Sequence, residues 1–181
     1  MNNFHSLYTR LNNQMSAELQ AATIDKETTI LVGIYTGGYW VAEKLHADLG
    51  FVQPLCAVST TLQRDDFPRV GLHKQKRASK LPLTIQGSKI ILVDDVLHTG
   101  RTVRAALNEL FEYGRPASVK LAILADRCER ELPIEPDFCG GKLVLMPHQK
   151  INLRQLSVDK SNQYNLEFYV DGKQSRTTDS L

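Results

Sequence analysis

The sequence predicts an α/β fold in which helices flank a central, mostly parallel sheet. Three apolar runs, at residues 28–35, 90–93 and 118–124, are rich in β-branched residues and too short to form helices. Continuous apolar runs of this kind are typical of strands that are buried on both faces. Each of the first two runs is followed by a turn of small residues and then by apolar residues at helical spacing. This order predicts two strand–turn–helix units.

The chain is expected to begin with an amphipathic helix over residues 4–22. Apolar residues recur there at intervals of four, which places them on one face. They are Leu7, Leu11, Met15 and Leu19. That face would pack on the domain itself or on a partner subunit. The strand at 28–35 and the helix around residues 41–49 follow, and residues 53–62 predict another strand.

Residues 63–86 are polar and basic, and they form a long connection for a compact domain. The basic residues concentrate at 73–77, with Lys80 nearby. Three interpretations remain open: a solvated face, a surface that attracts phosphate, or a contact with an RNA backbone. After this segment the run at 90–93 resumes the sheet, and a helix is expected from about Val103.

The C-terminal part has a weaker pattern after Cys139. Residues 143–146, 151–156 and 165–170 predict short strands, and polar residues alternate with apolar ones in the last two. Residues 171–181 lack apolar residues until the last position, so we expect a disordered tail there. We expect residues 1–170 to form a single domain.

Composition excludes several classes of protein. The chain has 181 residues, 42% of them hydrophobic, and a net charge of +2, so no global nucleic-acid signature is present. The three cysteines have no metal-ligand spacing and suggest reduced thiols of a cytoplasmic protein. No signal peptide or membrane-spanning run is found, and no membrane partner is expected.

The stretch 94–102 carries the clearest chemical signal. Asp94 and Asp95 follow an apolar strand, and Thr99-Gly100 leads into a helix. Backbone N–H groups at the start of a helix favour an anion such as phosphate, whereas the carboxylates suit sugar hydroxyls or a metal ion. The order therefore predicts a pocket for a ribose 5-phosphate at the carboxyl end of a strand. The alternative is an ordinary turn between a strand and a helix, with an aspartate that caps the helix and no ligand site.

This stretch resembles the phosphoribosyl pyrophosphate (PRPP) motif of the type I phosphoribosyltransferases. Two neighbouring segments extend the resemblance, namely Arg101 to Ala105 and Tyr113-Gly114-Arg115-Pro116. With them, the sequence is most similar to the pyrimidine-operon attenuation regulators that are also uracil phosphoribosyltransferases. The resemblance covers about residues 31–141. It implies the type I phosphoribosyltransferase fold, with a flexible hairpin-like loop after residue 63 and a small C-terminal strand region.

The resemblance also implies site residues. Catalytic roles fall to Asp94 and Asp95, which would hold the ribose, and to Arg64. The phosphate of PRPP or UMP would be bound by Val96, Leu97, His98, Thr99, Gly100, Arg101 and Thr102. The pyrophosphate loop would be Thr36, Gly37 and Gly38, and uracil would be bound by Asp126, Arg127, Leu132 and Pro133. Mg²⁺ would act with PRPP, reaching Asp94 and Asp95 through PRPP or water.

Two positions depart from the family pattern. Gly37 stands where the family usually has an arginine, so the pyrophosphate would lose a bidentate cation. Either Lys44 or Arg64 would compensate for the missing arginine, or turnover would be poor. His98 stands where related uracil enzymes usually have tyrosine and purine enzymes have aspartate. A histidine there could help to remove a proton from uracil, or simply line the pocket edge.

The implied function is the conversion of uracil and PRPP into UMP and pyrophosphate, together with UMP-responsive regulation of pyrimidine biosynthesis genes. The implied partners are PRPP, uracil, UMP, the mRNA leader of a pyrimidine operon, and further copies of the chain in a homodimer or higher oligomer. One alternative is a nucleotide-sensing, RNA-binding regulator with little or no turnover. Another is a phosphoribosyltransferase for a purine or orotate, which the absence of aspartate at position 98 disfavours.

Overall fold

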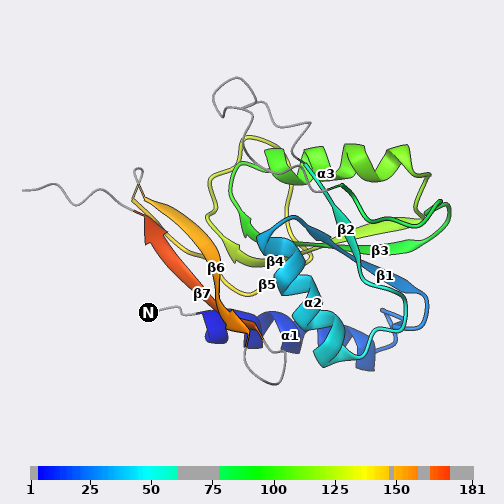
Figure 1. Ribbon diagram of the computed structural model, residues 1–181, viewed down its shortest axis with the longest axis horizontal. Coiled ribbons are helices and arrows are strands. Elements are labelled where there is room, and N and C mark those ends of the chain that lie inside the picture. Colours follow the sequence, from blue (N-terminus) through cyan, green and yellow to red (C-terminus); the bar gives the residue numbers. More distant parts are fainter. Residues whose placement is uncertain (1–3, 61–77, 147–148, 159–163, 172–181) are drawn as a thin grey trace, which may run out of the picture.

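The computed structural model of the chain describes residues 4–60, 78–146, 149–158 and 164–171. Figure 1 shows the arrangement of its helices and strands. In chain order these are α1 Phe4–Gln20, β1 Thr29–Ile34, α2 Gly37–Leu49, β2 Cys56–Val58, β3 Lys89–Leu97, α3 Arg101–Glu112, β4 Ser118–Asp126, β5 Phe138–Cys139, β6 Lys150–Val158 and β7 Tyr164–Asp171.

The described strands β1 to β5 form one parallel sheet in the order β2-β1-β3-β4-β5. Helices α1 and α2 cover one face of this sheet, and α3 covers the other (Figure 1). Strands β1 and β3 are almost fully buried, as their continuous apolar runs predicted. The predicted α/β class with a central parallel sheet flanked by helices is therefore confirmed.

The direction in which strands join the sheet reverses between β1 and β3. From β1 the chain passes through α2 to β2 on one side, whereas from β3 it passes through α3 to β4 on the other. In open α/β sheets, ligands bind beside the carboxyl ends of the strands at such a reversal. The predicted pyrophosphate loop follows β1, and the predicted phosphate-binding stretch includes the end of β3, so both lie at this point.

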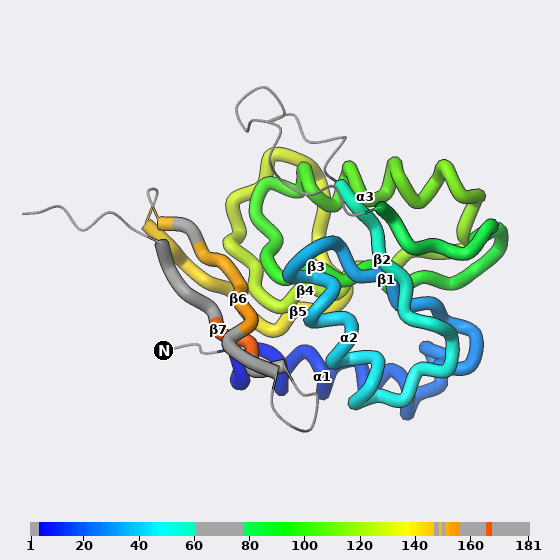
Figure 2. The backbone as a smooth tube through the Cα atoms, viewed as in Figure 1, coloured from blue at the N-terminus to red at the C-terminus, as the bar shows by residue number. Residues whose placement is uncertain are grey.

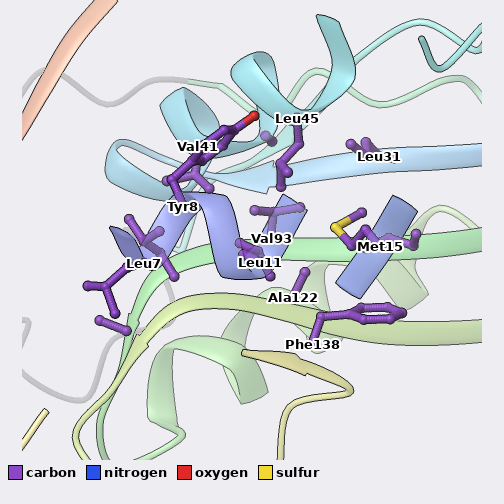
Figure 3. Close-up of a cluster of buried hydrophobic side chains, with 14 of the residues drawn as sticks. Leu7, Tyr8, Leu11, Met15, Leu31, Val41, Leu45, Val93, Ala122 and Phe138 are labelled. Atoms are coloured by element: carbon purple, nitrogen blue, oxygen red, sulfur yellow. The ribbon is translucent and has the colours of Figure 1, made fainter. Parts of the chain in front are cut away.

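Alternate residues of each strand supply two hydrophobic clusters. Leu31 and Val93 face α1 and α2, whereas their neighbours Val32 and Leu92 pack with α3 on the opposite face. Figure 3 shows side chains of α1, among them Leu11, against the strands of the sheet. This packing fixes α1 to the sheet of its own chain, which was one of the two predicted roles for its apolar face.

The remaining strands, β6 and β7, form an antiparallel pair outside the main sheet. Figure 2 shows this pair beside the first turns of α1, and β7 contacts that helix. Across the pair, Arg154 donates hydrogen bonds to Glu167. The small C-terminal strand region and the strands predicted at 151–156 and 165–170 are confirmed.

Several predicted boundaries were wrong. Strand β3 does not end before the acidic pair but continues to Leu97, because β4 pairs alongside it as far as Asp126. Residues 143–146 form no strand: Val144 is almost fully exposed, and Leu143 packs against the core only in part. The strand predicted over 53–62 shrinks to β2 within its described part.

Some predictions fall on residues outside the described ranges. These include Arg64, the basic cluster at 73–77, most of the hairpin-like loop, and residues 172–181 of the expected tail. Within the described ranges, no helix combines the length and the apolar character needed to cross a membrane.

Candidate active site

The acidic pair lies directly against the start of α2. A Cβ atom added at Gly37 would overlap the carboxylate of Asp95, and one added at Gly38 would come within 2.8 Å of the Asp94 Cα. A cis peptide between Tyr35 and Thr36 precedes α2. The first two residues of α2 therefore pack on β3 with no room for a side chain at either position. The predicted ribose and pyrophosphate residues thus meet at the strand reversal.

The two carboxylates differ in exposure. Asp94 is 5% exposed, and its Oδ1 accepts a hydrogen bond from the backbone N–H of Asp95 at 3.0 Å. Asp95 is half-buried and faces Gly37, the first residue of α2. Of the two, Asp95 is therefore the more accessible to a ligand beside the start of that helix.

The β3–α3 loop, residues 98–100, follows the acidic pair and begins the next helix. Gly100 adopts φ 91° and ψ −7°, which a residue with a side chain rarely adopts. A Cβ there would also lie 3.3 Å from Leu132 and from Ile134. Glycine thus lets the chain turn sharply into α3, where the Arg101 N–H donates to Thr99 Oγ1 at 3.3 Å. The N-terminal end of a helix favours an anion through its dipole. Of the predicted phosphate-binding residues, Val96 and Leu97 belong to β3 itself.

The β4–β5 loop, residues 127–137, is held over the β3–α3 loop by Arg130. Its guanidinium donates 2.8 Å bonds to both carboxylate oxygens of Asp126, a 3.0 Å bond to the His98 carbonyl and a 2.8 Å bond to the Ile134 carbonyl. Backbone bonds add to this, because Glu131 N donates to the Thr99 carbonyl. Arg130 therefore fixes one loop against the other.

The same bonds decide the charge of Asp126. Burial by itself would raise the pKa of this carboxyl, which is only 2% exposed. The hydrogen bonds from Arg130 and from the Cys128 backbone N–H outweigh that effect and hold the pKa below its usual range. The bond to Asp126 in turn raises the pKa of Arg130. With both oxygens engaged in this way, the side chain of Asp126 organises the loop.

Arg127, also predicted to bind uracil, has an unusual environment. Its side chain is 8% exposed and its backbone N–H donates to the Leu97 carbonyl at 2.9 Å. Within the described part of the chain, its buried Nε has no hydrogen-bond partner. A buried donor of this kind is costly unless something accepts from it.

Two ion pairs join the β4–β5 loop to the β3–α3 loop and to the start of α3. Glu129 Oε2 lies 2.6 Å from His98 Nε2 and 3.1 Å from Arg127 Nη2. Glu131 forms a second pair with Arg101, at 2.6 Å. The sequence pattern predicts no role for Glu129 or Arg130. The spacing of Asp126 and Arg130, an acid and a base four residues apart after a strand, was the available signal.

The structure therefore brings most of the predicted residues to one edge of the sheet. They come from the turn after β1, from the end of β3 with its loop, and from the β4–β5 loop. They are Thr36, Gly37, Gly38, Asp94, Asp95, Val96, Leu97, His98, Thr99, Gly100, Arg101, Thr102, Asp126, Arg127, Leu132 and Pro133. Lys44, offered as compensation for the missing arginine, is paired with Asp48.

The donor set suits a divalent cation that is held mainly by its substrate. Within the described ranges, no three His, Cys, Asp or Glu side chains gather as a metal site. Mg²⁺ needs only one or two carboxylates when phosphates and water supply its other ligands. Asp95, beside the first residue of α2, fits that requirement.

The family model of the phosphoribosyl transferase domain matches residues 5–155. The chain belongs to the phosphoribosyltransferase family. This phosphoribosyltransferase is 50% identical over 145 residues to the Bifunctional protein PyrR of Pseudomonas entomophila, a match that covers 79% of this chain and 84% of the relative. The Bifunctional protein PyrR of Nitrosococcus oceani is 47% identical over 152 residues, a match that covers 83% of this chain and 82% of the relative.

Solved structures of other phosphoribosyltransferases share the fold. A hypoxanthine-guanine phosphoribosyltransferase from Bacillus anthracis superposes with a TM-score of 0.58 at 16% identity, covering 77% of this chain and 78% of that one. A purine phosphoribosyltransferase from Pyrococcus horikoshii superposes with a TM-score of 0.51 at 21% identity, covering 76% of this chain and 81% of that one. At these identities the likeness concerns the fold alone.

Proposed function

We propose that the chain is a uracil phosphoribosyltransferase that also regulates pyrimidine biosynthesis genes in response to UMP. The observation that carries the catalytic part is the meeting of Asp95 with the Gly37 turn at the strand reversal, beside the glycine-opened start of α3. The regulatory part is supported by relatives of about 50% identity that are named bifunctional PyrR proteins. The protein would act in the cytoplasm.

In the proposed reaction, a ring nitrogen of uracil attacks the anomeric carbon of PRPP and pyrophosphate leaves. Asp94 and Asp95 would hold the ribose hydroxyls, while N–H groups at the start of α3 would bind the 5-phosphate. Mg²⁺ supplies positive charge that neutralises the leaving pyrophosphate when it is bound with PRPP. Catalysis would rest on positioning and on this charge complementarity.

Uracil would lie under the β4–β5 loop. Arg127 would contact the base, and Leu132 and Pro133 would flank the ring. Arg64, from the segment outside the described residues, would contact phosphate. Because Arg130 holds this loop, the base site would be rigid before uracil arrives.

The second candidate is a nucleotide-sensing, RNA-binding regulator with little or no turnover. Gly37 favours this second candidate, because the position offers only backbone groups to pyrophosphate. The arginine that is usual in the family would bind pyrophosphate as a bidentate cation. The RNA would be the mRNA leader of a pyrimidine operon, and the chain would act as a homodimer or higher oligomer.

The deciding experiment measures UMP formation from labelled uracil and PRPP with Mg²⁺, with hypoxanthine and orotate in parallel. We expect turnover with uracil alone, and its loss when the metal is chelated. The variant Asp94→Asn with Asp95→Asn is the negative control, and it should lose PRPP binding while remaining folded. Turnover with hypoxanthine or orotate would contradict the uracil assignment. No turnover, with UMP still raising the Tm, would favour the second candidate.

A further inference from the structure

Glu129 lies between the side chains of His98 and Arg127. Its Oε2 is 2.6 Å from His98 Nε2 and 3.1 Å from Arg127 Nη2. His98 belongs to the loop after β3, whereas Glu129 and Arg127 belong to the loop after the neighbouring strand β4. The three side chains therefore meet where the phosphate-binding and uracil-binding residues adjoin.

The hydrogen bond to Glu129 decides which nitrogen of His98 carries the proton. An ionised carboxylate can only accept hydrogen bonds, so Nε2 must be the donor. In the neutral ring, Nδ1 then keeps its lone pair and can accept a proton. The backbone carbonyl of His98 is fixed separately by Arg130 at 3.0 Å. Both the ring and the main chain of this residue are thus held in place.

Charged groups surround this arrangement on both loops. Arg127 borders Glu129 on one side, and Arg130, bonded to Asp126, lies behind the His98 carbonyl. Arg127 is almost buried, so it restrains Glu129 and keeps a negative charge beside the imidazole. A carboxylate in this position stabilises the imidazolium that forms when the ring accepts a proton, as in other His–carboxylate pairs.

We propose that His98 is the proton acceptor for the nucleobase and that Glu129 is the residue that positions it. This inference rests on the proposed function. In the step, the N1–H proton of uracil moves to Nδ1 of His98, and the N1 electron pair forms the bond to C1′ of the ribose. The C1′–O bond breaks, and its electron pair leaves with pyrophosphate. Arg127 holds Glu129 in place throughout.

A surface ion pair without function is the competing explanation, since His98 and Glu129 side chains are 39% and 51% exposed. The chain contains a matched control for it. Glu131 sits two residues further along the same loop, is 50% exposed, and pairs with Arg101 instead of a histidine. Glu129→Gln and Glu131→Gln therefore remove the same charge from side chains of similar exposure, and only the first removes a partner of the histidine.

The first test compares kcat for UMP formation across pH 5–9 in wild type, His98→Asn, Glu129→Gln and Glu131→Gln. We expect wild type and Glu131→Gln to lose activity at acid pH, where a histidine base becomes protonated. Glu129→Gln should lower kcat roughly 10- to 100-fold with little change in KM for PRPP, and His98→Asn should lose the acid limb of the profile. Wild-type kcat in His98→Asn, or equal losses in both glutamine variants, would overturn the proposal.

The second test needs no turnover. In protein labelled with ¹⁵N-histidine, NMR shows which ring nitrogen of each histidine carries hydrogen, and the His98 signals are identified by their absence from His98→Asn. We expect an unprotonated Nδ1 in wild type and in Glu131→Gln, and a mixture of tautomers in Glu129→Gln. Hydrogen on Nδ1 in wild type would overturn the role of Glu129. If wild type makes no UMP, the proposed function fails, and this spectrum still decides the positioning role.

Discussion

Gly37 and Gly38 are adjacent and both lack space for a Cβ, but for different reasons. At Gly38 the obstacle is backbone, namely the Val93 carbonyl and the Cα of Asp94, whereas at Gly37 it is the carboxylate of Asp95. A carboxylate can rotate away, but strand backbone inside a sheet cannot. The two positions therefore separate the stability of the turn from its function.

We predict that Gly38→Ala destabilises the fold by about 1–3 kcal/mol, because the added methyl group forces the turn away from β3. Gly37→Ala should change stability by less than about 1 kcal/mol but raise the KM for PRPP, since Asp95 must leave its place. Urea unfolding and PRPP titration of both variants measure this. If Gly37→Ala kept the wild-type KM, the placement of Asp95 beside the pyrophosphate would be wrong.

At the scale of elements, α1 is held mainly by a row of fully buried side chains. Leu11 has no exposed surface and lies in the cluster with Val93 and Ala122 (Figure 3). Tyr8, also buried, donates a 2.7 Å hydrogen bond to Asp48 of α2 and so ties the two helices together. Burial raises the pKa of Tyr8 far above its usual value, so the phenol remains a donor.

We predict that Leu11→Ala lowers the free energy of unfolding by about 2–5 kcal/mol, because it leaves a cavity between α1 and the sheet. Leu83→Ala is the matched control. Leu83 is fully exposed, and its truncation should change stability by no more than about 0.5 kcal/mol. Urea unfolding of both variants gives the comparison, and equal losses would contradict the packing of α1 described above.

The elements that the sequence predicted correctly are those with strong local patterns. Apolar residues recur at intervals of four in α1 and form continuous runs in β1 and β3. These local patterns are sufficient to predict which residues are buried. Two outcomes depended on distant partners instead. Strand β3 extends through its acidic pair because β4 pairs beside it, and the short strand β5 exists only by pairing with β4.

At the scale of the whole molecule, the site depends on three loops that are brought together by the sheet order. The polar residues at the end of β3 predicted one of these loops, and the resemblance to the phosphoribosyltransferases implied the residues of the other two. The sequence could not predict that Arg130 would hold two loops together, since its four acceptors come from three separate positions along the chain, namely Asp126, His98 and Ile134. Such a role becomes visible only when β3 and β4 lie side by side.

The Asp126–Arg130 pair predicts how the molecule responds to acid. The pKa of Asp126 is lowered in the folded state, so its contribution to stability is complete above the carboxyl pKa of the unfolded chain, about 4. It is lost as the pH falls through the lower, folded-state value. Asp25 and Asp48, whose pKa values are also lowered, act in the same direction.

We predict that Asp126→Asn loses about 3 kcal/mol of stability at pH 7, because Arg130 remains without its carboxylate. Below pH 4 the gap to wild type should narrow, since the variant has no carboxylate left to protonate at this position. Urea unfolding at pH 7, 5 and 3 measures both effects. Asp25→Asn, in an exposed turn where Asp25 accepts from Glu27 N and Thr28, is the control and should stay closer to wild type throughout. A gap for Asp126→Asn that is the same at every pH would show that lost packing, and not the ion pair, joins the two loops.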